Sequence, residues 1–422
     1  MRGNITALAI LLLIFLSIDV YVFQAFRYIG QSLSPTLRKS IYIIYWTITI
    51  LTLIGFLSYN LGNPEKWSRF AKTMVFSSMM VIYFSKLFVV LFLLVDDVVR
   101  LIRWMVYKIQ SVAADQQPAN TSTPISRHEF LVKAGLIVGS LPFISMAYGI
   151  IAGAHDYTIR RVTIRLKKLP IAFDGLRIAQ LSDIHAGSFY NKFAVERGIQ
   201  MLLNEKPDVV FFTGDLVNDR ADEMVDYKDV FAKVKAPMGV YSVLGNHDYG
   251  DYVQWPSAQA KSENLKRLIN IHKEMGWDIL INENRKLEKD GESIAIIGVE
   301  NWGAKGRFPK YGKLSKAYKG IEDTPVKLLL SHDPSHWDAE VRQKYKDIDI
   351  MFSGHTHGFQ FGVEIANVKW SPVKYMYEQW AGLYQKGEQF LYVNRGFGYI
   401  GYPGRVGITP EITIIELKSD MS

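Results

Sequence analysis

Five short polar clusters in the second half of the chain hold residues that could bind metal ions or phosphate. The clusters contain five of the nine histidines of the 422-residue sequence, and they are Ser182-Asp183-Ile184-His185, Gly214-Asp215, Gly245-Asn246-His247-Asp248, Ser331-His332-Asp333 and Ser353-Gly354-His355-Thr356-His357. Imidazole nitrogens combined with carboxylate and amide oxygens form a mixed ligand set that suits Mn, Fe or Zn. The sequence has no cysteine, which excludes thiolate ligands and disulfides.

The spacing within the clusters indicates a shared site. One residue separates Asp183 from His185 and His355 from His357, so both side chains of each pair can face the same side of an extended segment. Glycines at positions 214, 245 and 354 let the backbone turn tightly and approach a ligand closely. A carboxylate that bridges two cations holds them about 3.5–4 Å apart, a spacing that activates a water and binds an anionic substrate.

Short β-rich runs must position these clusters. We predict eight strands, at Leu176–Leu181, Asp208–Thr213, Gly239–Leu244, Ser293–Val299, Val326–Leu330, Ile348–Phe352, Gln389–Val393 and Ile412–Leu417. Helical patterns lie between some of them, at Phe193–Asn204 and Lys261–Met275. Strand–helix alternation followed by successive strands predicts a mixed α/β domain. Five of the strands end in a cluster, and the carboxyl ends of strands are where ligand sites assemble in α/β sheets.

The ordered series Asp-x-His, Gly-Asp, Gly-Asn-His-Asp, a lone His and Gly-His-x-His resembles the calcineurin-like metallophosphoesterase superfamily. The resemblance covers roughly Leu169–Leu417, and five motifs in this order are far more specific than any one of them. The N-terminal anchor and the entry strand Asp174-Gly175-Leu176-Arg177-Ile178 are similar to membrane-bound bacterial members. The resemblance implies two packed mixed β-sheets flanked by helices.

The resemblance also implies a role for each cluster residue. Two divalent or transition metal ions are expected, with Mn, Fe or Zn preferred. One metal would be held by Asp183, His185 and His357, the other by Asn246, His332 and His355, and Asp215 would bridge them. His247 would not bind metal but would face the substrate phosphate, and Asp248 would orient His247. A metal-activated hydroxide would then attack phosphorus in line.

We therefore expect a phosphohydrolase that acts on a phosphoester, phosphodiester or pyrophosphate bond. The partner would be a phosphorylated small molecule or a lipid-linked substrate, for which a UDP-diacylglucosamine-like pyrophosphate is one possibility. The alternative is a non-catalytic sensor or transport-associated membrane protein that keeps the metal fold only to bind a phosphorylated ligand. A complete set of seven ligands together with His247 favours the enzyme, because a binder has no need of the whole set.

Other polar and aromatic residues are weaker candidates. Arg395 follows a predicted strand and could contact phosphate or form an ion pair. Trp302, Trp370, Trp380 and the aromatic stretch Tyr375–Tyr384 could line a substrate groove or face a membrane, although core packing is favoured. His128, His155 and His272 are interpreted as structural or surface residues, whereas His336 lies four residues after His332 but matches no motif position.

The first third of the chain is predicted to be membrane. Four apolar runs lie near residues 5–26, 41–61, 73–95 and 134–154, and each approaches the ~20 residues that a helix needs to span a bilayer. Asp19 and Lys86 interrupt two of the runs and are costly in lipid unless they face other helices, where they could pair. The predicted organisation is a transmembrane helical region at 1–157 and a metallophosphoesterase domain at 158–422.

The distribution of charge bears on partners and orientation. The net charge is +8, but the basic residues are scattered or flank apolar runs, which predicts topology signals rather than nucleic-acid binding. The third loop, which includes the polar stretch Ala113–Pro124, is the most basic. The segment Ser126–Lys133 resembles a twin-arginine export signal in which His128 replaces the second arginine. We expect an integral protein of the bacterial cytoplasmic membrane, with its catalytic domain outside the cytoplasm.

Overall fold

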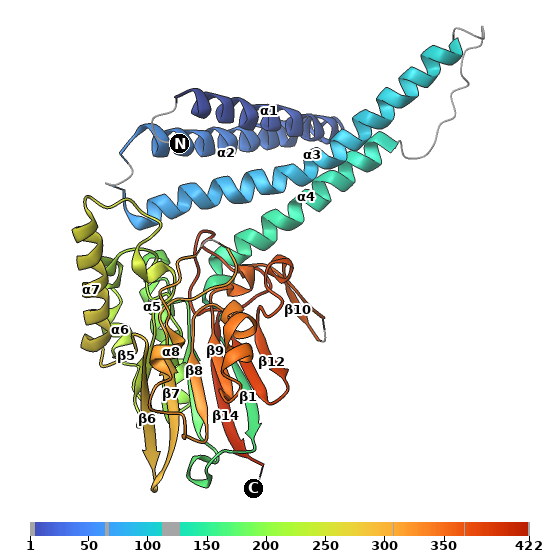
Figure 1. Cartoon of the computed structure of the whole chain (residues 1–422). Coiled ribbons are helices and arrows are strands. Elements are labelled where there is room, and N and C mark those ends of the chain that lie inside the picture. Colours follow the sequence, from blue (N-terminus) through green and yellow to red (C-terminus); the bar gives the residue numbers. More distant parts are fainter. Residues whose placement is uncertain (1–4, 64–66, 112–126, 307, 367, 421–422) are drawn as a thin grey trace. The chain divides into compact units, whose positions relative to one another are not determined.

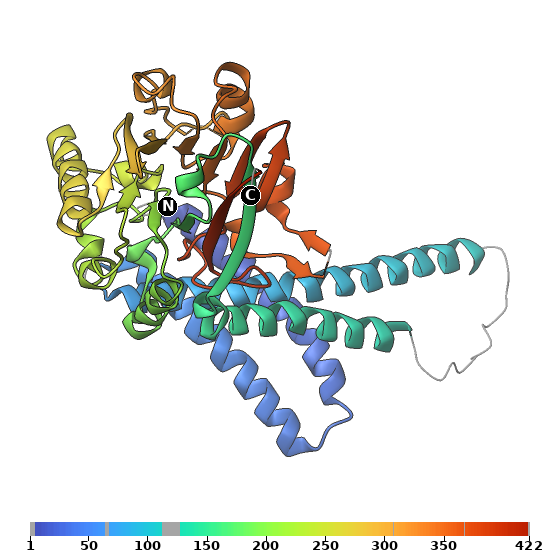
Figure 2. The ribbon, with the colours of Figure 1, turned by 90° about the horizontal axis from the view of Figure 1, so that it is seen from below.

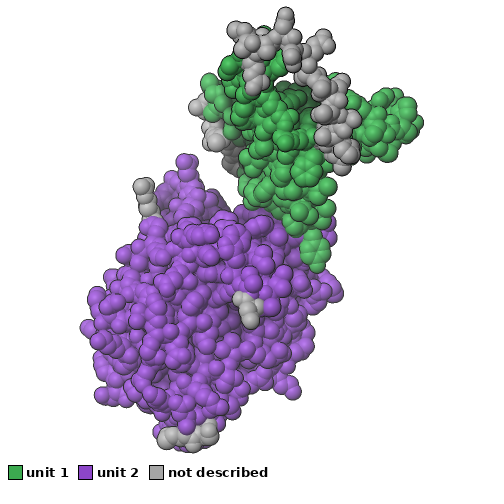
Figure 3. Space-filling view, turned by 90° about the vertical axis from the view of Figure 1, so that its right-hand side faces the viewer, with its two compact units in different colours: residues 1–148 green, residues 149–422 purple. Residues whose placement is uncertain are grey.

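The computed structural model describes residues 5–63, 67–111, 127–306, 308–366 and 368–420 (Figure 1). It divides into two compact units, Met1–Tyr148 and Gly149–Ser422, which Figure 3 colours separately. The division precedes residue 157 because the last turn of the fourth helix packs within the second unit, where the Arg405 backbone N–H donates to the Gly149 carbonyl over 3.1 Å. The predicted polar loop Ala113–Pro124 and Ser126 lie outside the described residues.

The N-terminal region forms the four predicted apolar helices. They are α1 (Ile5–Gly30), α2 (Pro35–Leu61), α3 (Arg69–Ser111) and α4 (Arg127–Ile151), and each is long and apolar enough to cross a membrane. Helix α3 continues well beyond the predicted span because no glycine or proline interrupts residues 96–111. Figures 1 and 2 show α3 and α4 running side by side, and Gly139 lets them approach, since a Cβ there would lie 2.4 Å from a Val89 methyl carbon.

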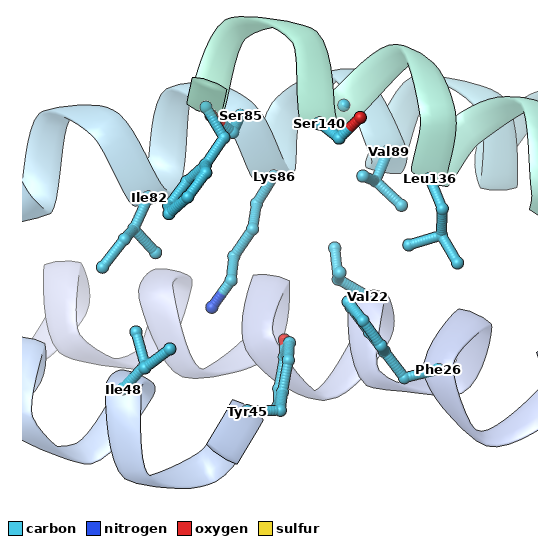
Figure 4. A pocket seen from close by; sticks show the side chains of 12 residues that line it. Val22, Phe26, Tyr45, Ile48, Ile82, Ser85, Lys86, Val89, Leu136 and Ser140 are labelled. Atoms are coloured by element: carbon cyan, nitrogen blue, oxygen red, sulfur yellow. The ribbon is translucent and has the colours of Figure 1, made fainter. Parts of the chain in front are cut away.

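The two charged residues of the apolar runs form an ion pair inside the first unit. Lys86 contacts Asp19, which is fully buried, and its Nζ also donates to Thr49 Oγ1 over 3.1 Å. The hydroxyl of Tyr83 donates to the second Asp19 oxygen over 3.0 Å. Figure 4 shows Lys86 reaching across a cavity of about 260 Å³ whose other walls are mainly apolar. The pairing explains how both charges are tolerated among apolar helices.

The second unit contains two six-stranded mixed sheets and a small hairpin. The first sheet has the order β1 (Thr158–Leu166), β14 (Glu411–Ser419), β2 (Arg177–Leu181), β3 (Val209–Phe212), β4 (Val240–Ser242), β5 (Asp278–Ile279). The second has the order β12 (Gly382–Lys386), β13 (Gln389–Val393), β9 (Ile350–Ser353), β8 (Lys327–Leu330), β7 (Glu292–Gly298), β6 (Glu283–Lys289). The hairpin pairs β10 (Val363–Ile365) with β11 (Val368–Trp370).

The sheets pack face to face, and helices cover their outer faces. Alternate side chains of β3 show why: Phe211 packs between the sheets, where its ring lies 5.0 Å from that of Phe352, whereas Phe212 joins the outer core. The covering helices are α5 (Lys192–Asn204), α6 (Lys228–Phe231) and α7 (Ala258–Glu274) on one side and α8 (Leu314–Ala317) and α9 (Arg342–Lys344) on the other. The predicted α/β fold of two mixed sheets flanked by helices is confirmed.

The parallel strands at the centre of each sheet bring their carboxyl ends to one edge. Strands β2, β3 and β4 run parallel in the first sheet, and β8 and β9 run parallel in the second. The polar clusters follow these five strands.

Candidate metal centre

Strained turns hold several of the predicted ligands. The backbone φ is 51° at Asp183, 50° at His185, 61° at Asp215, 70° at His355 and 51° at His357. These are five of the eleven described non-glycine residues with positive φ, a conformation that costs energy for residues with a Cβ. The surrounding structure must enforce it. Such a concentration of strain is typical of a functional site.

Asp183, His185 and His357 form one group of facing donor atoms. The two histidine Nε2 atoms lie 3.0 Å apart, and His357 Nε2 lies 3.2 Å from Asp183 Oδ1. All three side chains are buried, and their ligand atoms lie within 4.8 Å of one another. One cation could therefore contact all three residues.

Asn246, His332 and His355 form a second group beside the first. Asn246 Oδ1 lies 3.1 Å from His332 Nε2 and 2.8 Å from His355 Nδ1, and the two histidine nitrogens are 3.3 Å apart. The three donor atoms thus converge from the turns after β4, β8 and β9. Their nitrogen and oxygen chemistry matches that of the first group.

Asp215 lies between the two groups. Its Oδ2 atom is 3.5 Å from His185 Nε2 in the first group and 3.2 Å from His332 Nε2 in the second. Its Oδ1 atom accepts the backbone N–H of His247 over 2.8 Å, which fixes the carboxylate in place. One carboxylate reaching both groups is the arrangement that a bridging ligand requires.

Hydrogen bonds behind the histidines select which ring nitrogen faces the centre. His332 Nδ1 lies 2.8 Å from the Thr213 carbonyl, which can only accept, so this nitrogen carries the proton and Nε2 offers a lone pair. His355 is held the other way round: its Nε2 lies 2.9 Å from the Tyr377 hydroxyl, which also contacts Asp333 over 3.4 Å. Nδ1 of His355 therefore faces Asn246. Outer partners of this kind orient ligating histidines.

His247 lies at the edge of the centre and is half-buried. Its Nδ1 atom is 2.7 Å from the Asn218 carbonyl, so the proton sits there and Nε2 is the ring atom left for a substrate. The ring centroid lies 5.0 Å from that of His185 and 4.6 Å from that of Tyr252. The position beside the ligands, rather than among them, fits the role expected for His247.

The structure corrects the expected role of Asp248. We expected this carboxylate to orient His247, but the Asn218 carbonyl binds the ring instead. Asp248 is fully buried and accepts backbone N–H groups from two turns, at Asp215 (2.9 Å) and Leu216 (2.8 Å) in one and Gly245 (2.8 Å) in the other. Asp248 thus joins the turn after β3 to the turn after β4. Its bonds fix the backbone of the turns that carry Asp215 and Asn246.

Two of the glycines are required by close contacts with candidate ligands. A Cβ at Gly354 would lie 2.1 Å from Asp183 Oδ2 and 1.9 Å from Ser182 Oγ. A Cβ at Gly245 would lie 2.2 Å from Asp215 Oδ1. All three distances are far shorter than a non-bonded contact. The glycines therefore allow the turns to meet as predicted.

The buried carboxylates create a strong preference for positive charge. Burial alone lowers the pKa of His332, but the nearby Asp215 and Asp183 carboxylates outweigh it and raise the pKa to about 10. Burial opposes ionisation of Asp183 as well, yet His357 and His332 hold its pKa below the usual range. The carboxylates therefore favour a cation, a proton included, on the lone pairs of the histidine ligands. Metal ions would compete for the same lone pairs.

Several weaker candidates prove to be structural. Arg395 does not point to the centre; it lies 2.6 Å from both Glu364 and Glu411, so it is an internal ion-pair residue. Trp380 is buried in a small apolar cluster, and Trp302 stacks against His336 at 4.3 Å. The remaining histidines have local partners: Asp96 for His128, Ser242 for His272, and Ser331 and Glu340 for His336, while His155 packs among aromatic rings.

Sequence reasoning missed several residues that support the ligands. Tyr377 belongs to an aromatic stretch that we interpreted as core or surface. Arg405 is almost fully buried; its guanidinium donates to the carbonyls of Arg395 (2.8 Å) and Gly398 (2.5 Å) and lies 3.4 Å from His357 Nδ1. A single arginine in a Gly-rich segment belongs to no motif, so the sequence does not indicate that Arg405 supports His357.

Comparison with known proteins agrees with this geometry. Residues 176–359 match the family described as calcineurin-like phosphoesterase, and residues 1–154 match the family described as probable calcineurin-like phosphoesterase, transmembrane domain. An uncharacterized metallophosphoesterase of Bacillus subtilis is 31% identical over 262 residues, which are 61% of this chain and 84% of that protein. The chain belongs to the calcineurin-like phosphoesterase family.

Two further relatives are informative. A transmembrane protein with metallophosphoesterase domain from Danio rerio is 31% identical over 280 residues, 64% of this chain. The chain spans 60% of the length of that relative. The UDP-2,3-diacylglucosamine pyrophosphatase of Chlamydia trachomatis is 27% identical over 57% of this chain and 83% of that protein.

Proposed function

We propose that this chain is a membrane-anchored phosphohydrolase that uses two metal ions to cleave a phosphoester, phosphodiester or pyrophosphate bond. The observation that carries the proposal is the position of Asp215, whose Oδ2 atom lies 3.5 Å from His185 Nε2 and 3.2 Å from His332 Nε2. Two groups of ligand atoms that share one carboxylate are what a dinuclear hydrolytic site needs.

The donor set of each group supports a Mn, Fe or Zn site. Asp183, His185 and His357 would hold one ion, Asn246, His332 and His355 the other, and Asp215 both. When bound, the two cations polarise the phosphoryl oxygens and lower the pKa of a water molecule. The absence of cysteine from the chain leaves nitrogen and oxygen as the ligand atoms, which these ions accept.

The chain itself contributes a proton-bearing group beside the ligands. His247 is fixed through Nδ1 by the Asn218 carbonyl, so its Nε2 atom can hold a proton toward a phosphoryl oxygen or the leaving oxygen. Tyr252 packs against the His247 ring. Its hydroxyl also accepts a hydrogen bond from Asn246 Nδ2 over 2.9 Å, which orients a ligand of the second group. That bond turns the Asn246 carbonyl oxygen toward His332 and His355.

A lipid-linked substrate is the class that we favour. Four helices suited to membrane crossing precede the centre, and the Chlamydia trachomatis relative is named for hydrolysis of UDP-2,3-diacylglucosamine, a lipid-bearing pyrophosphate. A site held at a bilayer meets such substrates at high local concentration.

We further propose that the loops at one end of the helix bundle are cytoplasmic. Tyr28 at the end of α1 packs against His128 at the start of α4, with ring centroids 4.5 Å apart, so the α1–α2 and α3–α4 connections emerge at the same end. The basic residues near that end are Arg27, Arg38, Lys39, Arg100, Arg103, Lys108 and Arg127. Because basic loops stay inside, α4 would lead from the cytoplasm to an external catalytic unit.

The test of function uses the full chain in detergent. The protein is stripped with a chelator, reloaded with Mn, Fe or Zn, and assayed for bound metal and for turnover of bis-p-nitrophenyl phosphate, nucleotides and glycolipid pyrophosphates. We expect two metals per chain and metal-dependent turnover of at least one substrate class. If two metals are bound but none of the tested substrates is turned over, the result would instead support the non-catalytic sensor.

A further inference from the structure

An apolar surface lies next to the metal centre. We call it the apolar rim and define it as Phe359, Val363, Ile365, Val368, Tyr375 and Met376, whose side chains are between 40% and 75% exposed. These residues are six of the twelve exposed large hydrophobic residues described in the second unit, and they fall within eighteen positions. Such concentration on a surface marks an interaction site.

The rim is tied closely to the ligands. Phe359 follows His357 by two positions in the same short 3-10 helix, η8 (His357–Gln360). Tyr375 ends the 3-10 helix η9 (Pro372–Tyr375), two positions before the Tyr377 that binds His355. The hairpin β10–β11 places Ile365 directly opposite Val368 at its tip. The rim is thus linked to the centre in two places, through η8 and through the contact of Tyr377 with His355.

Backbone hydrogen bonds connect the segment that leads into the rim hairpin to the last turn of the apolar helix α4. The Arg405 N–H donates to the Gly149 carbonyl in the last turn of α4. The next residue, Val406, exchanges backbone hydrogen bonds with Gln360 (2.8 Å) and Gly362 (2.9 Å), which lead directly into β10. A Cβ at Gly153 would lie 2.2 Å from the Arg405 carbonyl, so this junction is tightly packed.

The nearness of the rim to the end of α4 indicates which partner covers the rim. Ile151, the last residue of α4, is 80% exposed within this protein and follows an apolar run suited to the bilayer. Only two backbone hydrogen-bonding steps separate Gly149 from the strand that carries the rim. Lys374 lies over the Tyr375 ring at 5.3 Å, and aromatic and basic side chains together are typical of a membrane interface.

We propose that the apolar rim enters the headgroup region of the bilayer and holds the metal centre against the membrane surface. The partner is therefore a lipid surface. This contact does not depend on catalysis, but it deepens the proposed function. A centre whose border lies in lipid faces phosphoesters that reside in the membrane.

The absence of native cysteine allows a direct test in the full chain. Single variants Ile365→Cys and Tyr375→Cys are labelled with an environment-sensitive fluorophore and reconstituted in vesicles of phosphatidylcholine brominated in the acyl chains. The control is Asp290→Cys, an exposed turn between β6 and β7 at the amino end of β7, opposite the edge that carries the ligands. All three variants are first checked for unchanged metal content.

We expect bromine to quench the label at both rim positions at least about threefold more than at position 290, because interfacial segments enter lipid by ~5–10 Å. Equal quenching at all three positions would overturn the proposal and leave the rim as a surface for another partner. The result is independent of turnover. Quenching without hydrolysis would contradict the proposed function but support the membrane contact.

Discussion

Asp19 in the first unit and Asp215 in the second are both buried carboxylates, but their neighbours differ in kind. Asp19 faces the ammonium group of Lys86 and also accepts a hydrogen bond from Tyr83. Asp215 faces histidine nitrogens, two of which lie within 3.5 Å of its Oδ2 atom. The first carboxylate is neutralised within the chain. Asp215 is instead surrounded by imidazole rings, which can bind a metal ion when they are neutral.

The contrast separates a structural charge from a charge that awaits a partner. The two charges of an internal ion pair neutralise each other, so the pair has little attraction for an external ion. Carboxylates together with an amide oxygen and four imidazoles form a set that only cations satisfy fully. The Asp215 and Asp183 carboxylates favour a positively charged neighbour in the same way, and they raise the pKa of His332 to about 10. Burial alone does not distinguish the two sites; the neighbours do.

Removing the shared charge is expected to have the largest effect. Asp215→Asn keeps the shape of the side chain but removes its negative charge and replaces one oxygen with an NH2 group that cannot bind a cation. Both metals and all measurable turnover should therefore be lost together. Metal analysis and a diesterase assay on the same sample provide the measurement. The matched control is Asp229→Asn, an exposed carboxylate that pairs with Lys192 over 2.8 Å. Retention of two metals by the Asp215 variant would show that this carboxylate is not shared.

Removing the proton-bearing ring should separate chemistry from metal binding. His247→Ala takes away Nε2 but leaves the seven ligands, so we expect full metal content and turnover reduced about 10²–10⁴-fold, the usual contribution of a positioned acid. The comparison with Asp215→Asn is informative because only one variant loses metal. Normal turnover in a metal-loaded His247 variant would refute the assigned role.

Breaking the closed pair tests the other half of the comparison. Asp19→Asn leaves the Lys86 charge without its counterion among apolar helices and should destabilise the protein by ~3–5 kcal/mol, whereas Asp19→Leu combined with Lys86→Met should restore most of that loss. Thermal unfolding in detergent measures both. Glu129→Gln, which breaks the surface pair with Lys133, is the control and should cost under ~1 kcal/mol. A double variant as unstable as Asp19→Asn would indicate that the pair does more than neutralise itself.

Much of the fold could be predicted because its central strands are apolar on both faces. The Val209–Phe212 strand is buried at every position, and the predicted strand there differs from it only at the ends. The prediction missed edge strands such as β6, Glu283–Lys289, and β12, Gly382–Lys386, whose exposed faces carry polar residues. Their pairing depends on neighbours that a local pattern does not reveal.

The candidate site divides in the same way. The seven predicted ligands belong to motifs, and the structure brings their side chains together. The groups that orient them are a backbone carbonyl for His332, another for His247 and a tyrosine from a distant loop for His355. A carbonyl is present at every position of the chain, so its sequence contains no signal of this role. The misplaced role of Asp248 arose for that reason: the bond to His247 comes from a carbonyl that no residue type predicts.

The smallest expected effect tests whether such an outer group matters. Tyr377→Phe removes the hydroxyl that holds His355 Nε2 and should weaken binding of the metal at Asn246, His332 and His355 about 10–100-fold, with little change at the other metal. Competition with a graded chelator would resolve one weakened and one unchanged site. Tyr384→Phe is the matched control in the same stretch, because its hydroxyl accepts backbone N–H groups and touches no ligand. Equal weakening at both metals would mean that Tyr377 supports the fold of the centre rather than one histidine, since a positioning bond acts on the ligand it touches.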